Sequence, residues 1–344
     1  MILAIDAMGG DWGPSQVCPG ALAALESAPD LELVFIGDES KIKEACGHSG
    51  YESRYRILHT DEVVSGSDHP SKAIRSKRRS SLRLALEMVR SGEAAGCVSA
   101  GNTGAIVAGG VLVVGRVKGV DRPALSIMLP TQPEPTLMLD LGATVRCKPL
   151  NLVQFAYMGA LAYQAQRAVD RPLVKLLSNG SEEIKGDEVI GAARDMLRDD
   201  AFINYGGYIE ANDVPMGGSQ IVVCDGFTGN VMLKTFEGMA AFGKQLIKDE
   251  VKQSLLAKLG MAFFIPSGKR ILNKLDWQKY GGTPLLGLKG TVVKAHGRSQ
   301  APAIEGAVQV AYRSAQAKSA SLLAYQMEEL AERVGEAQSE EMTE

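Results

Sequence analysis

Cysteine and histidine are both scarce in this sequence. Five cysteines are scattered along the 344 residues, at Cys18, Cys46, Cys97, Cys147 and Cys224. None forms a Cys-x-x-Cys pair, and an odd number does not suit a disulfide framework, so we expect reduced thiols and a cytoplasmic location. The four histidines, His48, His59, His69 and His296, lack the spacing of metal ligands. We therefore expect no metal centre and no other cofactor.

Long apolar runs and an excess of positive charge are also missing. The longest apolar run, residues 106–115, has about half of the ~20 residues that a membrane span needs. The opening apolar run ends at Asp6 with no charged leader before it, so we expect no signal peptide. A net charge of -3 leaves no global basic field, so nucleic acid is not expected as a partner.

Several familiar catalytic signatures do not occur. The sequence contains no G-x-G-x-x-G after its first strand, no G-x-S-x-G and no H-E-x-x-H. Residues 238–244 match G-x-x-x-x-G-K, but Gln245 follows where Ser or Thr should hold magnesium. A nucleophilic cysteine is conceivable at Cys97, Cys147 or Cys224. Cys97 and Cys224 fall in expected strands, however, where cysteine usually packs in the core.

Glycine is abundant, and apolar strand-like runs alternate with helical patterns. Glycine accounts for 38 of 344 residues, about 11% against a usual ~7%. Helix spacing is clear at Leu82, Ala85, Leu86 and Val89. The alternation predicts an α/β fold with helices on both faces of a largely parallel sheet. A Pro-rich turn at 130–135 predicts a hairpin, and hence a mixed sheet. The expected strands are Ile2–Asp6, 33–37, 56–59, 97–100, Ala124–Leu129, 136–140, 173–178 and 220–225.

Glycine and polar residues follow five of these strands directly. In open α/β sheets, ligands bind beyond the carboxyl ends of the strands. We therefore expect the five segments to form one polar cleft at a single edge of the sheet, although each alone could be a simple connector. The segments are 6–11, 99–105, 140–143, 178–183 and 225–230.

The segment 99–105 is the best candidate for an anion site. Gly101 and Gly104 allow backbone N–H groups to crowd together, and Asn102 or Thr103 can cap a helix whose positive end faces a ligand. The alternative is a capped helix start without a ligand.

Two cationic features also stand out. Lys185 is expected at a helix start, where a positive charge opposes the helix dipole, so a functional role is favoured over a solvated one. The second feature is a basic run with cations at Lys72, Arg75, Lys77, Arg78 and Arg79. It is either a solvated helix face or a docking surface for an acidic partner.

An amphipathic segment at about 250–278 is expected to project from the body. Its apolar tip includes Phe263, Phe264 and Ile265, with Leu259 before it and Leu272 after it. Apolar and cationic faces on such a short element suit contact with acyl chains and a membrane surface. The alternative is a helical hairpin packed in a dimer interface or core. Residues 327–344 contain seven Glu and one Arg and are expected to form an acidic tail beyond a 1–326 unit.

Eight motifs together resemble the PlsX family of bacterial phosphate acyltransferases. The resemblance runs in the same order from residue 1 to about 315, and no single short motif is responsible for it. The sequence departs from the family pattern at Ser181, Arg298 and Gln300, so no role is assigned to these three. The motifs are DAMGGD (6–11), SAGNTGA (99–105), GRVKGVDRPAL (115–125), DLGA (140–143), EEIKG (182–186), CDGFTGNVMLK (224–234), YGGTPLLG (280–287) and HG (296–297).

This resemblance implies an activity and an architecture. The activity is transfer of a long-chain acyl group from acyl carrier protein (ACP) to inorganic phosphate, which gives an acyl phosphate for phospholipid synthesis. The architecture is a three-layer α/β/α sandwich of two intertwined subdomains, similar to the isocitrate/isopropylmalate dehydrogenases and usually dimeric. A glycerol-3-phosphate acyltransferase is expected downstream, and peripheral contact with the inner face of the membrane is expected as well.

The resemblance and the residue chemistry together suggest roles for individual residues. Phosphate is expected at the 101–104 loop, with Lys185 neutralising charge, Asn230 donating to the oxyanion or the phosphate, and His296 delivering a proton to the thiolate. Three carboxylates, Asp6, Asp140 and Asp225, are expected to orient these donors. The basic residues Lys72, Arg75, Arg78 and Arg79 are expected to contact ACP.

Two other functions are weighed against this one. An NAD-dependent decarboxylating dehydrogenase would share the fold, but it would need an Asp cluster for metal and Arg residues for substrate carboxylates, which are not found. A non-catalytic ACP- or lipid-binding scaffold would lose nothing if Lys185 were replaced by Ala.

Overall fold

The computed structural model describes residues 1–182, 184–254, 263–264, 267–268, 282–317 and 319–341. Within them, one mixed sheet has the strand order β3-β2-β1-β4-β11-β10-β5-β6-β9-β7-β8. Its strands are β1 (Ile2–Asp6), β2 (Glu32–Gly37), β3 (Tyr55–His59), β4 (Gly96–Ser99), β5 (Ala124–Leu129), β6 (Thr136–Leu139), β7 (Leu173–Leu177), β8 (Asn204–Ile209), β9 (Ile221–Val223), β10 (Thr283–Leu286) and β11 (Thr291–Lys294).

The sheet is mostly parallel, and its antiparallel pairs are gathered at its centre. β5 pairs antiparallel with both β6 and β10, and β10 pairs antiparallel with β11. The expected mixed sheet and the hairpin around the Pro-rich turn are therefore confirmed. Because β5 and β10 reverse the direction, β6, β7, β8 and β9 run opposite to β1, β2, β3, β4 and β11.

This reversal corrects one sequence prediction. The carboxyl ends of β1 and β4 lie at one edge of the sheet, whereas those of β6, β7 and β9 lie at the opposite edge. The five polar segments therefore follow strands of opposite direction, although three of them, 99–105, 140–143 and 225–230, still contribute residues to one cavity. Direction in a sheet is decided by pairing between distant strands, which the periodicity of one strand does not reveal.

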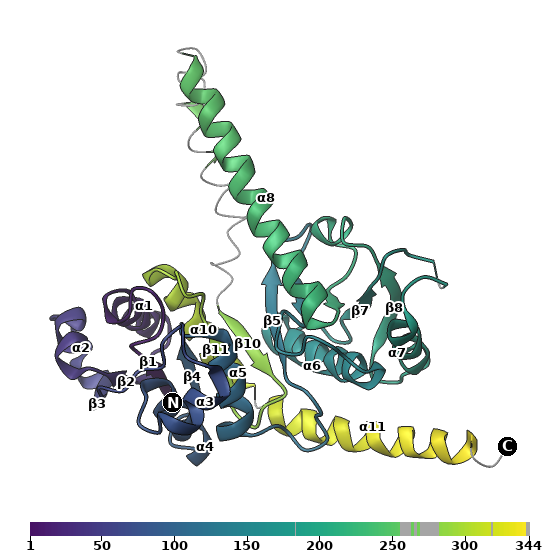
Figure 1. Ribbon diagram of the computed structural model, residues 1–344, viewed down its shortest axis with the longest axis horizontal. Helices are drawn as coiled ribbons and strands as arrows, with labels where there is room; N and C mark the ends of the chain where they lie inside the picture. The colour runs from purple at the N-terminus through teal and green to yellow at the C-terminus, as the bar shows by residue number, and fades with distance from the viewer. Residues whose placement is uncertain (183, 255–262, 265–266, 269–281, 318, 342–344) are drawn as a thin grey trace.

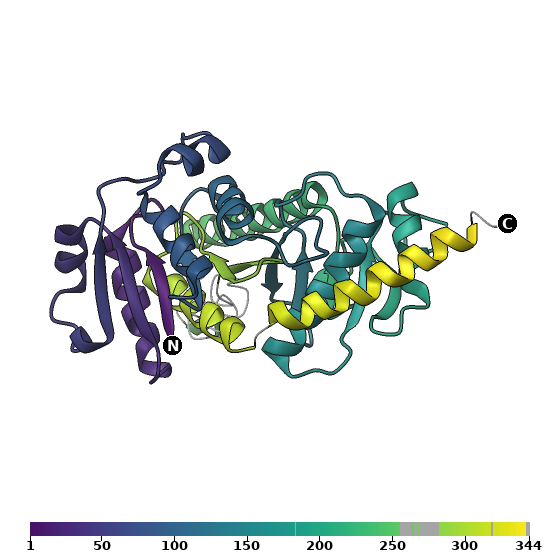
Figure 2. The same cartoon turned by 90° about the horizontal axis from the view of Figure 1, so that it is seen from below.

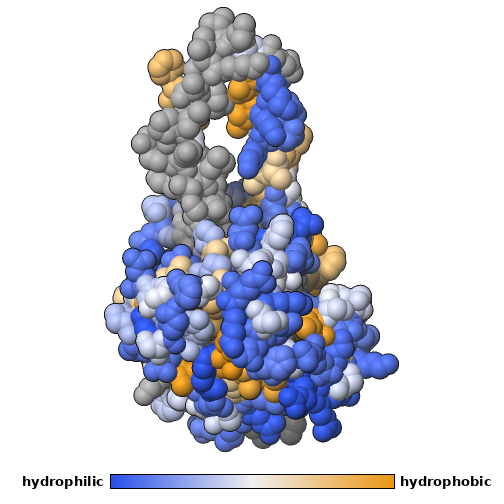
Figure 3. All heavy atoms as spheres, turned by 90° about the vertical axis from the view of Figure 1, so that its left-hand side faces the viewer, coloured by the Kyte–Doolittle hydropathy of each residue, from blue (hydrophilic) through white to orange (hydrophobic). Residues whose placement is uncertain are grey.

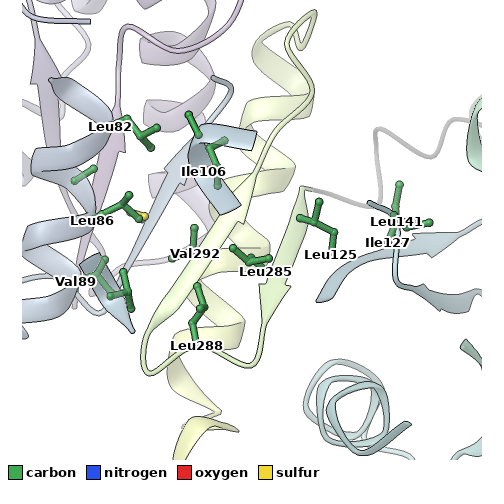
Figure 4. Close-up of a cluster of buried hydrophobic side chains, with 14 of the residues drawn as sticks. Leu82, Leu86, Val89, Ile106, Leu125, Ile127, Leu141, Leu285, Leu288 and Val292 are labelled. Carbon is green, nitrogen blue, oxygen red and sulfur yellow. The ribbon is translucent and has the colours of Figure 1, made fainter. Parts of the chain in front are cut away.

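Helices cover both faces of the half that contains the N-terminus (Figure 1). The helices α1 and α10 pack on one face around Leu3 and Ile5, and α4 and α5 pack on the other around Ala4. Figure 4 shows the second cluster extending from Leu82 and Leu86 on α4 to Leu285 and Leu125 on the central strands. The helices of this half are α1 (Pro14–Ser27), α2 (Glu39–Cys46), η1 (Glu52–Arg54), α3 (Pro70–Ser76), α4 (Ser81–Ser91), α5 (Thr103–Gly109), η2 (Gly110–Val114) and α10 (Ala301–Gln316).

The other half is covered mainly by α6, whose residues are buried along most of its length. The helix α11 lies against α6 across the base of this half (Figure 2) and buries Met327 and Leu330. The start of the segment expected to be an acidic tail is thus helical and packed. The helices of this half are α6 (Pro149–Arg167), α7 (Glu188–Arg198), η3 (Val214–Met216), α8 (Gly226–Gln253) and α11 (Ser319–Glu341).

The helix α8 packs on the body at its start and then projects away from it (Figure 1). Met232 is buried, while Met239, Phe242 and Ile247 are exposed. Figure 3 shows apolar surface on the projecting part. Most of the amphipathic segment expected at about 250–278, including Leu259, Ile265 and Leu272, lies outside the described residues.

Eight strands were predicted from the sequence, and each matches an observed strand to within two residues at either end. Three strands were not predicted. They are β8, which is glycine-rich, β10, which contains a proline, and β11.

Candidate active site

Both halves of the molecule contribute to one polar cavity beside the central strands. Its volume is about 350 Å³, and Leu125, Ile127 and Leu141 form its apolar part. Its polar residues come from four places: the end of β4, the first turns of α8, the start of β10 and the end of β11. They are Asn102, Thr103, Asn230, Lys234, Glu237, Thr283, Lys294, His296 and Ser299.

The loop after β4 is shaped by a buried hydrogen-bonded chain. Asp6 Oδ2 accepts a hydrogen bond from Ser99 Oγ at 2.6 Å, and Ser99 Oγ accepts one from the Gly101 N–H at 3.1 Å. Burial raises the pKa of Asp6. A Cβ on Gly9 would come within 2.8 Å of the Gly101 nitrogen, so only glycine fits there. Asp6 therefore orients the loop, although it does not line the cavity.

Asn102 ties this loop to the start of α5 and to the neighbouring segment. Its Oδ1 caps the helix by accepting from the Ala105 N–H at 3.0 Å, and its Nδ2 donates to the Gly66 carbonyl at 3.1 Å. Among the described residues, the N–H groups of Thr103 and Gly104 find no protein acceptor. These two groups are available to an anion at the cavity wall.

Asp140 and Asp225 order the main chain where α8 begins. Asp140 accepts from the N–H groups of Leu125 at 2.8 Å, Ala143 at 3.1 Å and Thr144 at 2.6 Å. Burial raises the pKa of Asp140 to about 6, and those hydrogen bonds oppose the rise. Asp225 caps α8 by accepting from the N–H groups of Phe227 and Thr228, each at 2.9 Å. Both carboxylates thus fix the turn that presents Asn230.

The charged wall of the cavity was only partly anticipated. Lys234 Nζ lies 2.6 Å from Glu237 Oε2, and Lys294 follows the buried Val293 at the end of β11. The pKa of Lys294 is lowered to about 8 by burial and then by the charge of Lys234. Sequence reasoning missed Lys234, Glu237 and Lys294. Two positions in the sequence could have indicated these residues. Lys234 is the last residue of the 224–234 motif, and Lys294 lies two residues before His296.

His296 is held in a neutral form with a defined tautomer. Its Nδ1 accepts from the Arg298 N–H at 3.2 Å, so the ring proton lies on Nε2. Burial and then the positive charge of Lys294 lower the pKa of His296, which keeps the imidazole uncharged at neutral pH. In this form His296 can donate one hydrogen bond from Nε2 but is a poor source of a free proton.

Among the predicted site residues, the structure brings together Gly101, Asn102, Thr103, Asn230 and His296. Gly104 follows in the same loop, packed beside Pro70. Lys185 is exposed on the segment between β7 and α7, and it does not line the cavity. Phe263 and Phe264 are exposed, at 87% and 49%.

The predicted ACP-binding residues lie on one surface around α3. Lys72, Arg75, Arg78 and Arg79 are all exposed, and none has an ion-pair partner among the described residues. Lys77, the fifth cation of the run, is instead paired with Asp68 at 2.5 Å. The four remaining cations are therefore free to meet an acidic surface.

Two of the candidate nucleophilic cysteines pack in the core, as expected from their place in or beside a strand. Cys97 and Cys224 are buried, and burial raises the pKa of each thiol. In the described part of the chain, no cluster of three or more His, Cys, Asp or Glu is arranged to hold a metal ion. No helix in that part is both long and apolar enough to cross a membrane.

Comparison with known proteins identifies relatives over most of the chain. Residues 1–322 match the family model described as fatty acid synthesis protein. A phosphate acyltransferase of Halorhodospira halophila is 44% identical over 316 residues, which are 91% of this chain and 92% of the relative. A phosphate acyltransferase of Thermoanaerobacter pseudethanolicus is 43% identical over 311 residues, 90% of this chain and 92% of the relative.

Solved structures share the fold at low sequence identity. A phosphotransacetylase from Streptococcus pyogenes superposes with a TM-score of 0.58 at 17% identity, covering 92% of this chain and 94% of that one. A branched-chain phosphotransacylase from Enterococcus faecalis gives a TM-score of 0.55 at 14% identity, covering 91% and 99%. At such identities the likeness concerns the fold alone.

Proposed function

This chain belongs to the fatty acid synthesis protein family and is a phosphate acyltransferase, and from that premise we propose which donor it uses and how its residues act. We propose that it moves a long-chain fatty acyl group from the thioester of ACP to inorganic phosphate, without a resident cofactor. The observation that supports this most is the cavity in which the 101–104 loop faces Asn230, Lys294 and His296.

The proposed reaction depends more on hydrogen-bond donors that position phosphate than on a general base. Phosphate is already an anion at neutral pH, so one of its oxygens can attack the thioester carbon directly. A C–O bond forms, the C–S bond breaks, and the electron pair leaves on sulfur. The free N–H groups of Thr103 and Gly104 would hold phosphate oxygens and fix the angle of attack.

Fixed donors would stabilise the charge that develops on the carbonyl oxygen. We assign this role to Asn230, which is presented by the turn that Asp140 and Asp225 order. One well-placed donor of this kind is worth about 3 kcal/mol of barrier. His296, neutral with its proton on Nε2, would donate a hydrogen bond to the leaving sulfur. Lys185 remains a proposed catalytic residue, although it does not line the described cavity.

The basic surface of Lys72, Arg75, Arg78 and Arg79 is proposed to dock ACP. It lies beside the phosphate loop, because Asn102 donates to Gly66 and Gly104 packs beside Pro70, the first residue of α3. A carrier protein bound there could direct its thioester arm into the cavity. The proposed partner is acidic, so attraction between the two surfaces would weaken with salt.

We further propose a homodimer in peripheral contact with the inner face of the membrane. Four large apolar side chains on α8 are exposed, and a second copy of the chain would cover them; they are Phe227, Met239, Phe242 and Leu246. Phe263 and Phe264 are the described part of the proposed membrane contact. The product would then pass to a glycerol-3-phosphate acyltransferase.

The three-layer α/β/α sandwich similar to the isocitrate/isopropylmalate dehydrogenases remains part of this proposal. The division of the chain into one unit of two intertwined subdomains at residues 1–326 and an acidic tail at residues 327–344 also remains part of this proposal. Helices on both faces of each half of the sheet support the layered description.

The decisive experiment incubates the protein with palmitoyl-ACP and radiolabelled phosphate and looks for labelled acyl phosphate, trapped with hydroxylamine as the hydroxamate. We expect label in the acyl product and release of free ACP thiol in equal amounts. Palmitoyl-CoA serves as the matched donor without a carrier protein. Thiol release without acyl phosphate would contradict the proposal.

A further inference from the structure

Two ammonium groups line the described part of the cavity, and their surroundings differ. Lys234 on α8 is paired with Glu237 at 2.6 Å and is about half exposed, at 54%. Lys294 ends β11 between two buried residues, Val293 and Ala295, and its side chain points into the space bounded by Asn230 and His296. The two lysines therefore are not equivalent.

The ammonium of Lys294 has no partner among the described residues. No carboxylate, carbonyl or hydroxyl there lies within hydrogen-bond or ion-pair distance of its nitrogen, whereas the nearby Glu237 is taken by Lys234. The Lys294 side chain is part-buried, and withdrawing a cation from water without giving it a partner destabilises a fold. The lowered pKa of about 8 is consistent with this environment, and it still leaves the group charged at neutral pH.

We propose that Lys294 binds the attacking phosphate directly, as the cation of the phosphate site; this inference rests on the proposed function. An anion entering the cavity would supply the missing partner. Lysine suits phosphate because its ammonium acts as a compact point charge with three donors. The free N–H groups of Thr103 and Gly104 line the same cavity or follow directly in its wall.

The charges around Lys294 favour an anion over a neutral ligand. From α8 it faces Lys234 and Glu237, which nearly cancel, and from its own strand end it faces the uncharged His296. The excess charge of this group is therefore about one positive unit. Phosphate affinity should fall as the pH rises through about 8, because Lys294 loses its proton there.

The test measures binding of inorganic phosphate to the whole protein by calorimetry, without an acyl donor. Lys294→Met removes the charge and keeps the length of the side chain. Lys289→Met is the matched control, because Lys289 is an exposed lysine in the turn that joins β10 to β11. We expect Lys294→Met to weaken phosphate binding at least tenfold, and the control to change it less than twofold.

Steady-state kinetics and stability give two further readouts. With saturating acyl donor, Lys294→Met should raise the KM for phosphate at least tenfold, with the KM for the donor unchanged. Without phosphate, Lys294→Met should melt at the same temperature as wild type or higher, because an unpaired, part-buried cation has been removed. Phosphate should raise the melting temperature of wild type and of Lys294→Arg more than that of Lys294→Met.

The results separate this inference from the proposed function. Phosphate binding by Lys294→Met within twofold of wild type would overturn the inference, even if wild type makes acyl phosphate. Tenfold weaker binding in Lys294→Met would support it, even if wild type proved unable to use acyl-ACP. If Lys294→Met did not fold, the stability argument would be wrong, and Lys294→Gln would decide the binding question by the same criterion.

Discussion

Asp140 is a buried carboxylate that fixes a loop of the site, and its burial lowers the stability of the folded protein at neutral pH. It is fully buried, and it accepts three backbone N–H groups that fix the loop facing α8. Those hydrogen bonds favour the ionised form, but burial outweighs them and raises the pKa to about 6. In the folded protein, Asp140 therefore retains its proton to a higher pH than in the unfolded chain.

This difference predicts how stability depends on pH. A carboxyl whose pKa is raised on folding contributes stability that is present below about pH 4 and lost as the pH rises through about 6. Between pH 4 and pH 7, the loss for Asp140 should be about 2–3 kcal/mol. Asp140→Asn lacks this titration, so the stability of wild type relative to this variant should be greater at pH 4 than at pH 7 by that amount.

Urea unfolding of wild type and Asp140→Asn at pH 4, 5, 6 and 7 measures this difference. Asp170→Asn, at an exposed aspartate, serves as the control and should show no such trend. A stability difference that is the same at all four pH values would show that the pKa of Asp140 is not raised.

Lys185 and Asn230 allow the proposed catalytic roles to be tested individually. Asn230 lines the cavity, whereas Lys185 is exposed outside it. We predict that Lys185→Ala and Asn230→Ala each lower kcat/KM by roughly 30- to 1000-fold, because each removes about 2–4 kcal/mol of electrostatic stabilisation. Initial rates of acyl phosphate formation measure the effect, with Lys244→Ala on the projecting part of α8 as control.

Neither variant should alter the melting temperature by more than a few degrees, since both side chains are exposed. If Lys185→Ala retains wild-type turnover while Asn230→Ala loses it, Lys185 is not catalytic and the cavity cations alone serve the reaction.

At the scale of elements, α3 and the turn after it present the basic surface beside the phosphate loop. Its buried residues Ala73 and Ile74 hold the helix on the body, so Arg78 and Arg79 can be changed without disturbing packing. We predict that Arg78→Glu/Arg79→Glu raises the KM for acyl-ACP at low salt and has less effect at high salt, because surface charges are screened within ~8–10 Å. The value of kcat should change little.

Steady-state kinetics at 20 and 300 mM salt measure the effect, and palmitoyl-CoA is the control donor because it lacks the carrier protein. Lys289→Glu serves as a charge reversal at a distant exposed position. An unaltered KM for acyl-ACP at low salt would show that the carrier binds elsewhere.

Helix α8 connects two functions in one element. Its first turns, capped by Asp225, present Asn230, Lys234 and Glu237 to the cavity, and its later turns leave the body with Met239, Phe242 and Leu246 exposed. The same helix therefore contributes polar side chains to the candidate active site and apolar side chains to the proposed dimer contact.

At the scale of the whole molecule, the projecting region is the proposed contact with the membrane. Two exposed aromatic side chains, Phe263 and Phe264, lie beyond the end of α8. Burial in lipid would stabilise attachment by about 1.5–3 kcal/mol for each side chain. We predict that Phe263→Asp/Phe264→Asp reduces flotation with anionic vesicles severalfold while the protein keeps its oligomeric state.

Leu322→Asp, on the exposed face of α11 with the same 49% exposure as Phe264, is the matched control. Gel filtration with light scattering monitors the oligomeric state of all variants. If the double variant stays dimeric and floats as well as wild type, the segment has a structural role and does not bind membrane.

The sequence by itself determined the elements and much of the local chemistry. Apolar periodicity and turn residues are local features, so eight strands, the Pro-rich hairpin and a helix cap at Asn102 or Thr103 were predicted before any tertiary contact was known; the cap is Asn102. The order of motifs also predicted the family, which the relatives confirm. The expected strand positions were sufficient to predict that Cys97 and Cys224 pack in the core.

Only the tertiary structure decided which of these residues meet. Strand direction depends on pairing between segments far apart in the chain, so the opposite orientation of the two halves could not be inferred from local patterns. The chemistry of Lys294 likewise depends on partial burial at the end of β11 and on the pairing of Glu237 with Lys234 one turn apart on α8. Solvation and long-range charge are properties of the folded chain, and for that reason the sequence analysis overlooked Lys294.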